Sequence, residues 1–180
     1  VDVINVGSNY RPGDTLTVEA KRFLSGFFSK YFLCMDEFYK FTKGDSTLSI
    51  PVKVFLVGMV LLSQGSKSSK LSFAFNLMSE SVGRSDESLS FEGLASFVGV
   101  LLSSLHSVTE AMKKAMDAYG LARVMTSIKN AANVLVATIY EQLNKAEEDD
   151  ITFEEFADWY TYGGFEVSPW LELLDLKKWE

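Results

Sequence analysis

The 180-residue chain contains one cysteine, one histidine and three prolines, and it has no long apolar run. A single cysteine, Cys34, cannot form a disulfide within the chain, and a single histidine, His106, cannot build a multi-histidine metal site. Thiolate clusters, haem pairs and di-iron carboxylate–histidine centres are therefore excluded. The most apolar stretch, residues 52–62, is interrupted by Lys53 and Gly58 and is well short of the roughly 20 residues that span a bilayer. We expect no membrane span.

Positive charge is also scarce, with 17 Lys and Arg against 24 Asp and Glu and a net charge of −7. The resulting field repels phosphate backbones and anionic lipid, so nucleic acid is not an expected partner. The chain begins at Val1 without a basic segment ahead of an apolar one, and no signal peptide is expected. Because a lone cysteine suits a reducing compartment, we expect a cytoplasmic location. Association with the cytoskeleton is compatible with this expectation.

Apolar residues make up 47% of the chain and aromatic residues 13%, which is a composition typical of a globular protein with a core. Their spacing is mostly helical, and no segment keeps the period-two alternation of a strand. The sequence therefore predicts an all-α protein. Helices are predicted at about residues 14–29, 31–41, 51–63, 67–78, 91–105, 108–119, 122–145, 154–162 and 169–179.

Four short apolar–polar–apolar segments recur along the chain, each followed by helical spacing. They are Leu16–Val18, Leu48–Ile50, Leu89–Phe91 and Ile151–Phe153. A single extended residue between two helices is typical of a helix–loop–helix unit in which neighbouring loops pair through a very short two-stranded contact. We expect these segments to pair in this way.

This pattern resembles the EF-hand superfamily. Residues 70–77 (KLSFAFNL) resemble the entering helix of a third hand in the branch that includes calcineurin B and the neuronal calcium sensors. Residues 151–156 (ITFEEF) resemble the end of a fourth loop and the start of its exit helix. The segment from Leu48 to Gly65 is similar to degenerate EF-hand-like modules of larger scaffold proteins. The resemblance covers residues 9–162.

The resemblance implies two lobes of paired, degenerate EF-hand-like units followed by a separate helix. The N-terminal pair covers residues 1–65, the C-terminal pair covers residues 66–162, and a C-terminal amphipathic helix covers residues 163–180. Proteins of this kind accept an amphipathic helix in an apolar groove. The many Phe and Met residues of the chain suit a core that leaves part of its surface as such a groove.

Three of the four loops lack the ligands that calcium needs. An EF-hand loop supplies oxygen ligands from positions 1, 3, 5, 7, 9 and 12, with a bidentate Glu at position 12. If Leu16 and Leu48 stand at position 8, position 12 is Ala20 in the first loop and Val52 in the second. The third loop is longer by three residues and has Gly93 at position 12. None of these loops is expected to bind calcium.

The fourth loop is the one candidate for a metal site. Its candidate ligands, at positions 1, 5, 7, 9 and 12, are Asn144, Glu148, Asp150, Thr152 and Glu155. Against binding, Ala146 offers no ligand at position 3, and Asp149 stands at position 6, where glycine suits the sharp turn. The expected cofactor is therefore none, or weakly bound calcium. Magnesium-like occupancy and an acidic loop that folds without metal are the alternatives.

Catalytic signals are absent from the sequence. Cys34 has no visible basic partner, His106 stands near the end of an apolar helix, and no glycine-rich phosphate loop occurs. We therefore expect a non-catalytic protein-interaction or scaffolding module that is largely independent of calcium. Its partner would be a protein, either an amphipathic helix or an adjacent domain of a larger chain. The alternative function is a calcium-responsive sensor that uses the fourth loop.

The C-terminal segment carries its own apolar stripe. Gly163 and Gly164 can end the preceding helix, and Ser168 followed by Pro169 can start a new one. Its apolar positions at helical spacing are Trp170, Leu173, Leu174, Leu176 and Trp179. We expect this helix to dock on its own domain in the groove, with docking onto a following domain or a second chain as the alternative.

Overall fold

The computed structural model describes residues 15–17, 49–61, 63, 65–79, 87–111 and 118–175. Within these ranges helices predominate and the strands are only two or three residues long, which agrees with the all-α prediction. None of the described helices combines the length and the hydropathy that a membrane crossing requires.

The short strands form two separate antiparallel pairs. Strand β1 (Thr15–Thr17) pairs with β2 (Ser49–Pro51), and Leu16 lies opposite Ile50. Strand β3 (Ser88–Leu89) pairs with β4 (Ile151–Thr152), and Leu89 lies opposite Ile151. The recurring segments thus pair as predicted.

Near these strands, three details of the prediction were wrong. Thr15–Thr17 is a strand, so the first predicted helix does not begin there, and the rest of residues 14–29 and the helix at 31–41 lie outside the described residues. In the second segment, Ile50 takes the paired position predicted for Leu48. Pro51 ends β2 instead of starting a helix. At the end of a strand the missing amide donor of proline costs little.

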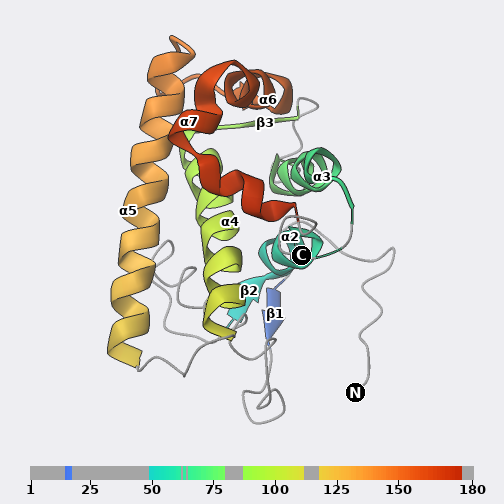
Figure 1. Ribbon diagram of the computed structural model, residues 1–180, viewed down its shortest axis with the longest axis vertical. Coiled ribbons are helices and arrows are strands. Elements are labelled where there is room, and N and C mark those ends of the chain that lie inside the picture. The colour runs from blue at the N-terminus through green and yellow to red at the C-terminus, as the bar shows by residue number, and fades with distance from the viewer. Residues whose placement is uncertain are drawn as a thin grey trace.

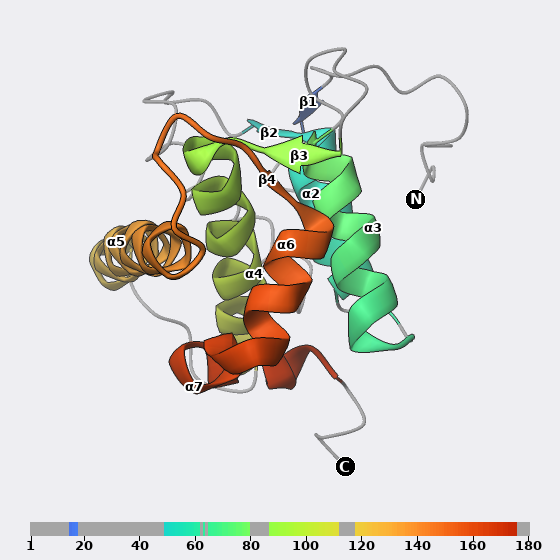
Figure 2. The same ribbon diagram turned by 90° about the horizontal axis from the view of Figure 1, so that it is seen from above.

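Eight helical segments follow the strands, or lie between them, in the described ranges. They are α2 (Val52–Leu61), α3 (Lys67–Ser79), α4 (Phe91–Ala111), α5 (Ala118–Gln142), α6 (Phe153–Trp159), the π-helix η3 (Tyr160–Gly164), α7 (Phe165–Val167) and the 3-10 helix η4 (Pro169–Leu174). Helix α4 lies between α5 on one side and the α2–α3 pair on the other (Figures 1 and 2). In the view of Figure 1, the C-terminal turns run in front of α4, from the side of α5 toward α2.

The two strand-to-helix junctions of the second pair are built alike. Leu89 and Ile151 are buried bridge residues, and each is followed by a hydroxyl that caps the next helix. The Ser90 hydroxyl accepts from the amide of Gly93 at 3.3 Å, and the Thr152 hydroxyl accepts from the amide of Glu155 at 3.2 Å. A short polar side chain at this place pairs an amide that the first turn leaves open, so the sequence itself sets where α4 and α6 begin.

Helix α4 is longer than predicted. It runs without a break from Phe91 to Ala111, so residues 108–111 of the predicted helix at 108–119 belong to α4, residues 118 and 119 belong to α5, and residues 112–117 lie outside the described residues. No Gly or Pro lies between Leu105 and Ala111, and nothing in that stretch ends the helix.

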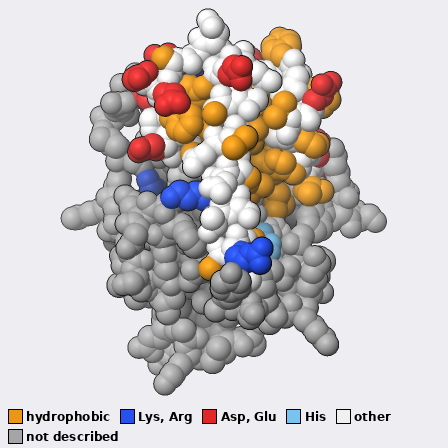
Figure 3. Space-filling view, turned by 90° about the vertical axis from the view of Figure 1, so that its left-hand side faces the viewer, with side chains coloured by type: hydrophobic (Ala, Val, Ile, Leu, Met, Phe, Trp, Pro, Cys, Tyr) orange, Lys and Arg blue, Asp and Glu red, His pale blue; other side chains and the backbone are white. Residues whose placement is uncertain are grey.

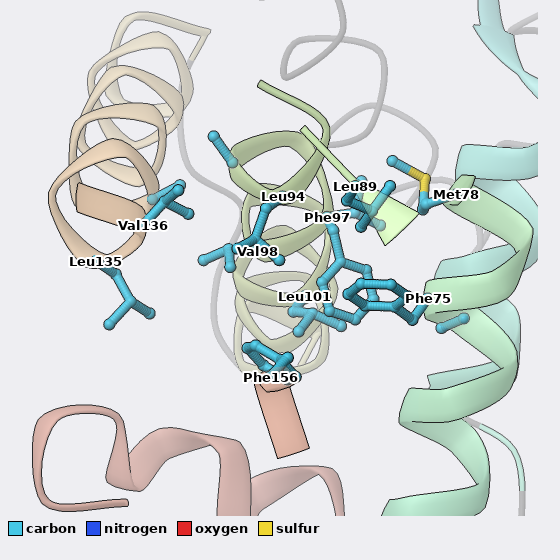
Figure 4. Close-up of a cluster of buried hydrophobic side chains, with 14 of the residues drawn as sticks. Phe75, Met78, Leu89, Leu94, Phe97, Val98, Leu101, Leu135, Val136 and Phe156 are labelled. Carbon is cyan, nitrogen blue, oxygen red and sulfur yellow. The ribbon is translucent and has the colours of Figure 1, made fainter. Parts of the chain in front are cut away.

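The core is centred on the inner face of α4 (Figure 4). Phe75 of α3 and Phe97 of α4 are fully buried, with ring centres 5.4 Å apart in an edge-to-face arrangement. The ring centre of Phe156 of α6 lies 6.0 Å from that of Phe97, and these two rings are also edge-to-face. Such pairs add to the free energy of burying the rings, so the aromatic residues hold α3, α4 and α6 together. Val57 and Leu61 of α2, from the predicted N-terminal unit, are fully buried in the same core.

The C-terminal segment differs from the predicted α-helix. Helix α6 ends at Trp159 and continues as the π-helix, in which Gly163 has a φ of 145°, so the predicted α-helix over 154–162 is shorter. Residues 169–174 form a 3-10 helix in place of the start of the predicted α-helix over 169–179, the end of which lies outside the described residues. With three residues per turn, Leu171 and Leu174 face the same side, and both are 1% exposed.

Candidate functional site

The fourth loop begins where α5 ends. Asn144 adopts a left-handed conformation with a φ of 54°, and its amide donates to the carbonyl of Glu141 at 3.1 Å. The next amide, that of Lys145, donates to the carbonyl of Tyr140 at 2.9 Å. These two bonds form a Schellman motif, which ends a helix around one left-handed residue. Asn144, predicted as the ligand at position 1, therefore ends α5, and it is exposed.

The ammonium of Lys145 points into the loop. Its Nζ lies 2.7 Å from Oε1 and 2.8 Å from Oε2 of Glu155, and it donates to the carbonyl oxygen of Asp150 at 2.6 Å. These oxygens stand at loop positions 12 and 7, where an EF-hand has its bidentate carboxylate and its backbone ligand. The Lys145 side chain is only 22% exposed, so the charge is held largely within the loop.

Glu155 also closes a capping box with Thr152. Its Oε2 accepts from the Thr152 amide at 2.9 Å, while the Thr152 hydroxyl accepts from the Glu155 amide. The hydroxyl predicted as the ligand at position 9 is thus used in capping α6. Burial opposes the charge of Glu155, but the hydrogen bonds from the Lys145 ammonium and the Thr152 amide outweigh it and hold the pKa of this carboxyl below its usual value.

Asp149 shapes the middle of the loop with its side chain. Its Oδ2 accepts from the amide of Ala146 at 2.9 Å, and its own amide donates to the Ala146 carbonyl at 3.0 Å. Among the described residues other than glycine, only Asn144 has a positive φ, so Asp149 does not make the left-handed turn expected at position 6. The Tyr140 hydroxyl donates to the Asp149 carbonyl at 2.7 Å. Burial, and then the charges of Asp150 and Asp149, raises the pKa of Tyr140 to about 12.

The five predicted ligands separate into two groups. The ligands that lie together are Asp150, Thr152 and Glu155, and the exposed ones are Asn144 and Glu148. In the described part of the chain, no three His, Cys, Asp or Glu side chains are placed to hold a metal ion. Calcium takes six to eight oxygens. The Lys145 ammonium occupies the Glu155 carboxylate and the Asp150 carbonyl, at positions 12 and 7, and Ala146 offers no ligand at position 3. The loop therefore does not fit a resident calcium ion.

A groove of about 460 Å³ lies between α3, α6 and the C-terminal turns. Its apolar walls come mainly from Leu71, Phe153, Phe156, Tyr160 and Phe165. Phe165 is 49% exposed, and next to it along the chain Tyr162 and Val167 are 87% and 43% exposed. The groove is therefore an open, largely apolar surface with a half-exposed aromatic residue, Phe165, in its wall.

A polar cluster closes one end of the groove. The Glu172 carboxylate accepts from the Tyr160 hydroxyl at 2.5 Å and forms an ion pair with Lys67. The Lys67 ammonium also lies 4.5 Å from the centre of the Tyr160 ring. Burial, followed by the Glu172 carboxylate, raises the pKa of Tyr160 above its usual range. These contacts tie η4 to α3 and η3.

Acidic side chains gather around the fourth loop. On the face formed by α5, Asp and Glu lie at the end of the molecule that carries the loop, and Lys and Arg are few (Figure 3). Glu147, Glu148 and Asp149 are exposed there. The ammonium of Lys145 therefore lies among side chains of opposite charge.

Several site residues could not be found from the sequence. Lys145 carries no motif, because its role depends on the Schellman turn that directs its long side chain into the loop. Phe165 lies beyond the two glycines, so helical spacing could not place it at the groove. Of the residues considered for catalysis, His106 is half-buried on α4, and Cys34 lies outside the described residues.

Comparison of the chain with protein-family models, with curated proteins and with solved structures gives no match. The EF-hand relationship accordingly stays a prediction that rests on the sequence motifs.

Proposed function

We propose that the chain is a non-catalytic protein-interaction module with EF-hand-like helix–loop–helix units, and that it binds an amphipathic helix of a partner protein in the groove between α3 and α6. The observation that carries the proposal is the open groove itself. Its walls are aromatic and aliphatic, and its volume of about 460 Å³ has room for more than one large side chain.

The side chains around the groove suit such a partner. Large exposed apolar residues that lie together are typical of interaction surfaces, and aromatic residues there commonly supply much of the binding free energy. Phe165, which lines the groove and is 49% exposed, is of this type. The polar edge formed by Lys67 and Glu172 offers charges of both signs, which orient a helix that carries polar residues beside its apolar stripe.

The fourth loop supports a function that does not need calcium. The ammonium of Lys145 already binds Glu155 and the Asp150 carbonyl, so a cation of the chain itself occupies these oxygens. The alternative function, a calcium-responsive sensor, would require the ion to displace this ammonium.

Selection from a displayed library of helical peptides tests the groove. Peptides selected on the wild type are compared on three variants: Ala157→Trp, which fills the groove, Phe165→Ser, which removes an exposed wall residue, and Val134→Ser, a control on α5. Val134 is 68% exposed and is not part of the groove. We expect affinity to fall by about tenfold or more, equal to 1.4 kcal/mol, on the first two and to stay unchanged on the control. Peptides that bind Ala157→Trp as tightly as the wild type would contradict the proposal.

A further inference from the structure

We infer that Lys145 is the resident cation of the fourth loop, a built-in ammonium that takes the place a divalent ion would occupy and keeps the loop in one folded state. This inference concerns the loop alone and does not depend on the partner proposed for the groove.

The contacts of the ammonium are those expected of a loop cation. An ammonium has three donors, and the Lys145 Nζ has three oxygens within 2.6–2.8 Å, two from Glu155 and one from Asp150. Both oxygens of the same carboxylate are engaged, as they are with a calcium ion at position 12. These distances are those of charge-assisted hydrogen bonds.

The backbone directs Lys145 into this position. The left-handed turn at Asn144 ends α5, and the amide of Lys145 completes the Schellman motif on Tyr140. The side chain then reaches across the loop to the first turn of α6, where Glu155 is oriented by the capping box. The ammonium therefore joins the end of α5 to the start of α6. A metal ion bound in an EF-hand loop links the entering and exit helices in the same way.

The loop is also coupled to the neighbouring unit. Ile151 pairs with Leu89 in the short sheet, and the hydroxyl of Ser88 donates to the Asp150 carboxylate at 3.3 Å. A loop held by its own lysine keeps this pairing at all calcium concentrations. The two paired loops then have the same structure with and without calcium.

A double-variant experiment with calcium as the probe tests the inference. Lys145→Met removes the charge and nearly keeps the side-chain length, and Ala146→Asp supplies the missing oxygen at position 3. We expect calcium at about 1 mM to leave the melting temperatures of the wild type and of Ala146→Asp unchanged. In the double variant, calcium should bind with a Kd below about 1 mM, at least about tenfold tighter than in Ala146→Asp alone, and raise the melting temperature.

Three outcomes would overturn the inference. They are saturable calcium binding by the wild type with a Kd below about 1 mM, equal binding by Ala146→Asp and the double variant, and a folded double variant that binds no calcium at about 1 mM. If the double variant does not fold, nuclear magnetic resonance of the ¹⁵N-labelled lysine ammonium groups in the wild type decides. We expect a slowly exchanging Lys145 ammonium signal that calcium does not change. Loss of this signal on adding about 1 mM calcium, or its absence throughout, would count against a resident ammonium.

Discussion

The buried ammonium of Lys70 donates to the carbonyl oxygen of Leu174, 3.2 Å away, and to that of Leu61 at 3.1 Å. These carbonyls belong to the last residues of η4 and α2, and the last turn of a helix leaves carbonyls without partners. Lys70 is 3% exposed, and burial lowers the pKa of its ammonium, an effect that Asp175 partly offsets. One side chain of α3 thus joins the end of the C-terminal segment to the end of α2.

Leu171→Ala should destabilise the protein far more than Leu173→Ala. Leu171 is 1% exposed, and removing its side chain leaves a cavity, so we expect a loss of about 2–5 kcal/mol in the free energy of unfolding. Leu173 is 45% exposed and serves as the matched control, with an expected change within about 0.5 kcal/mol. Urea unfolding measures both. Equal effects would show that η4 is not anchored as described.

Lys70→Met should destabilise the full chain more than a chain that ends at residue 167. In the full chain, the substitution leaves the buried carbonyls of Leu61 and Leu174 without a donor, at a cost of about 1–3 kcal/mol for each. In the shortened chain the second carbonyl is gone, so about half of the effect should disappear. Urea unfolding of the wild type and of Lys70→Met, each as the full and as the shortened chain, gives the coupling free energy between Lys70 and the C-terminal segment. An unchanged effect of Lys70→Met in the shortened chain would contradict the link to Leu174.

Part of this fold could be predicted from sequence because local chemistry determines it. Leu89 and Ile151 are single apolar residues between polar ones, followed by Ser or Thr, and that pattern alone fixes a buried bridge residue and a helix cap. The segment around Ser49 has apolar residues on both sides, Leu48 and Ile50, so the pattern could not determine which of them pairs.

Other features depend on long-range packing and could not be predicted. Lysine is rarely buried, so nothing in the sequence marks Lys70 as the residue that binds two helix ends. The 3-10 form of η4 places Leu171 and Leu174 on the same side, and both are buried in the core, a long-range packing that local spacing does not show. The ligand positions of the fourth loop are predicted by counting along the chain, whereas the contact of Lys145 with Glu155 depends on the fold.

Gly164→Ala and Gly163→Ala should both destabilise the protein, for different reasons. A Cβ on Gly164 would lie 2.7 Å from the Trp159 ring, and that ring is held by a hydrogen bond from its Nε1 to Gln142 at 2.6 Å. Overpacking of this kind costs about 1–3 kcal/mol. A Cβ on Gly163 meets nothing within 4 Å, but its φ of 145° is strained for alanine.

The Trp159 indole N–H resonance separates the two effects. It should shift in Gly164→Ala, because the ring must move, and stay in place in Gly163→Ala. An unmoved indole signal in Gly164→Ala would contradict the close packing of this glycine on the ring.

Glu155→Gln should remove a stabilisation that depends on pH. Because the folded protein lowers the pKa of Glu155, its contribution is fully present above the unfolded value of 4.5 and is lost as the pH falls through the folded pKa. Glutamine preserves the capping box but not the ion pair with Lys145. We expect a loss of about 0.5–1 kcal/mol at pH 7, modest because Glu155 is 37% exposed and open to screening by solvent.

Glu154→Gln is the matched control for this pH dependence. Glu154 is the exposed neighbour in the first turn of α6 and shares the favourable interaction with the helix N-terminus, but no ion pair with Lys145 is present for it. Urea unfolding between about pH 2.5 and 7 should show the difference between wild type and Glu155→Gln shrinking toward zero in acid, with a smaller dependence for Glu154→Gln. A difference that stays constant down to the lowest pH would mean that the carboxylate of Glu155 does not hold the ammonium, and Lys145 would then not be the resident cation of the fourth loop.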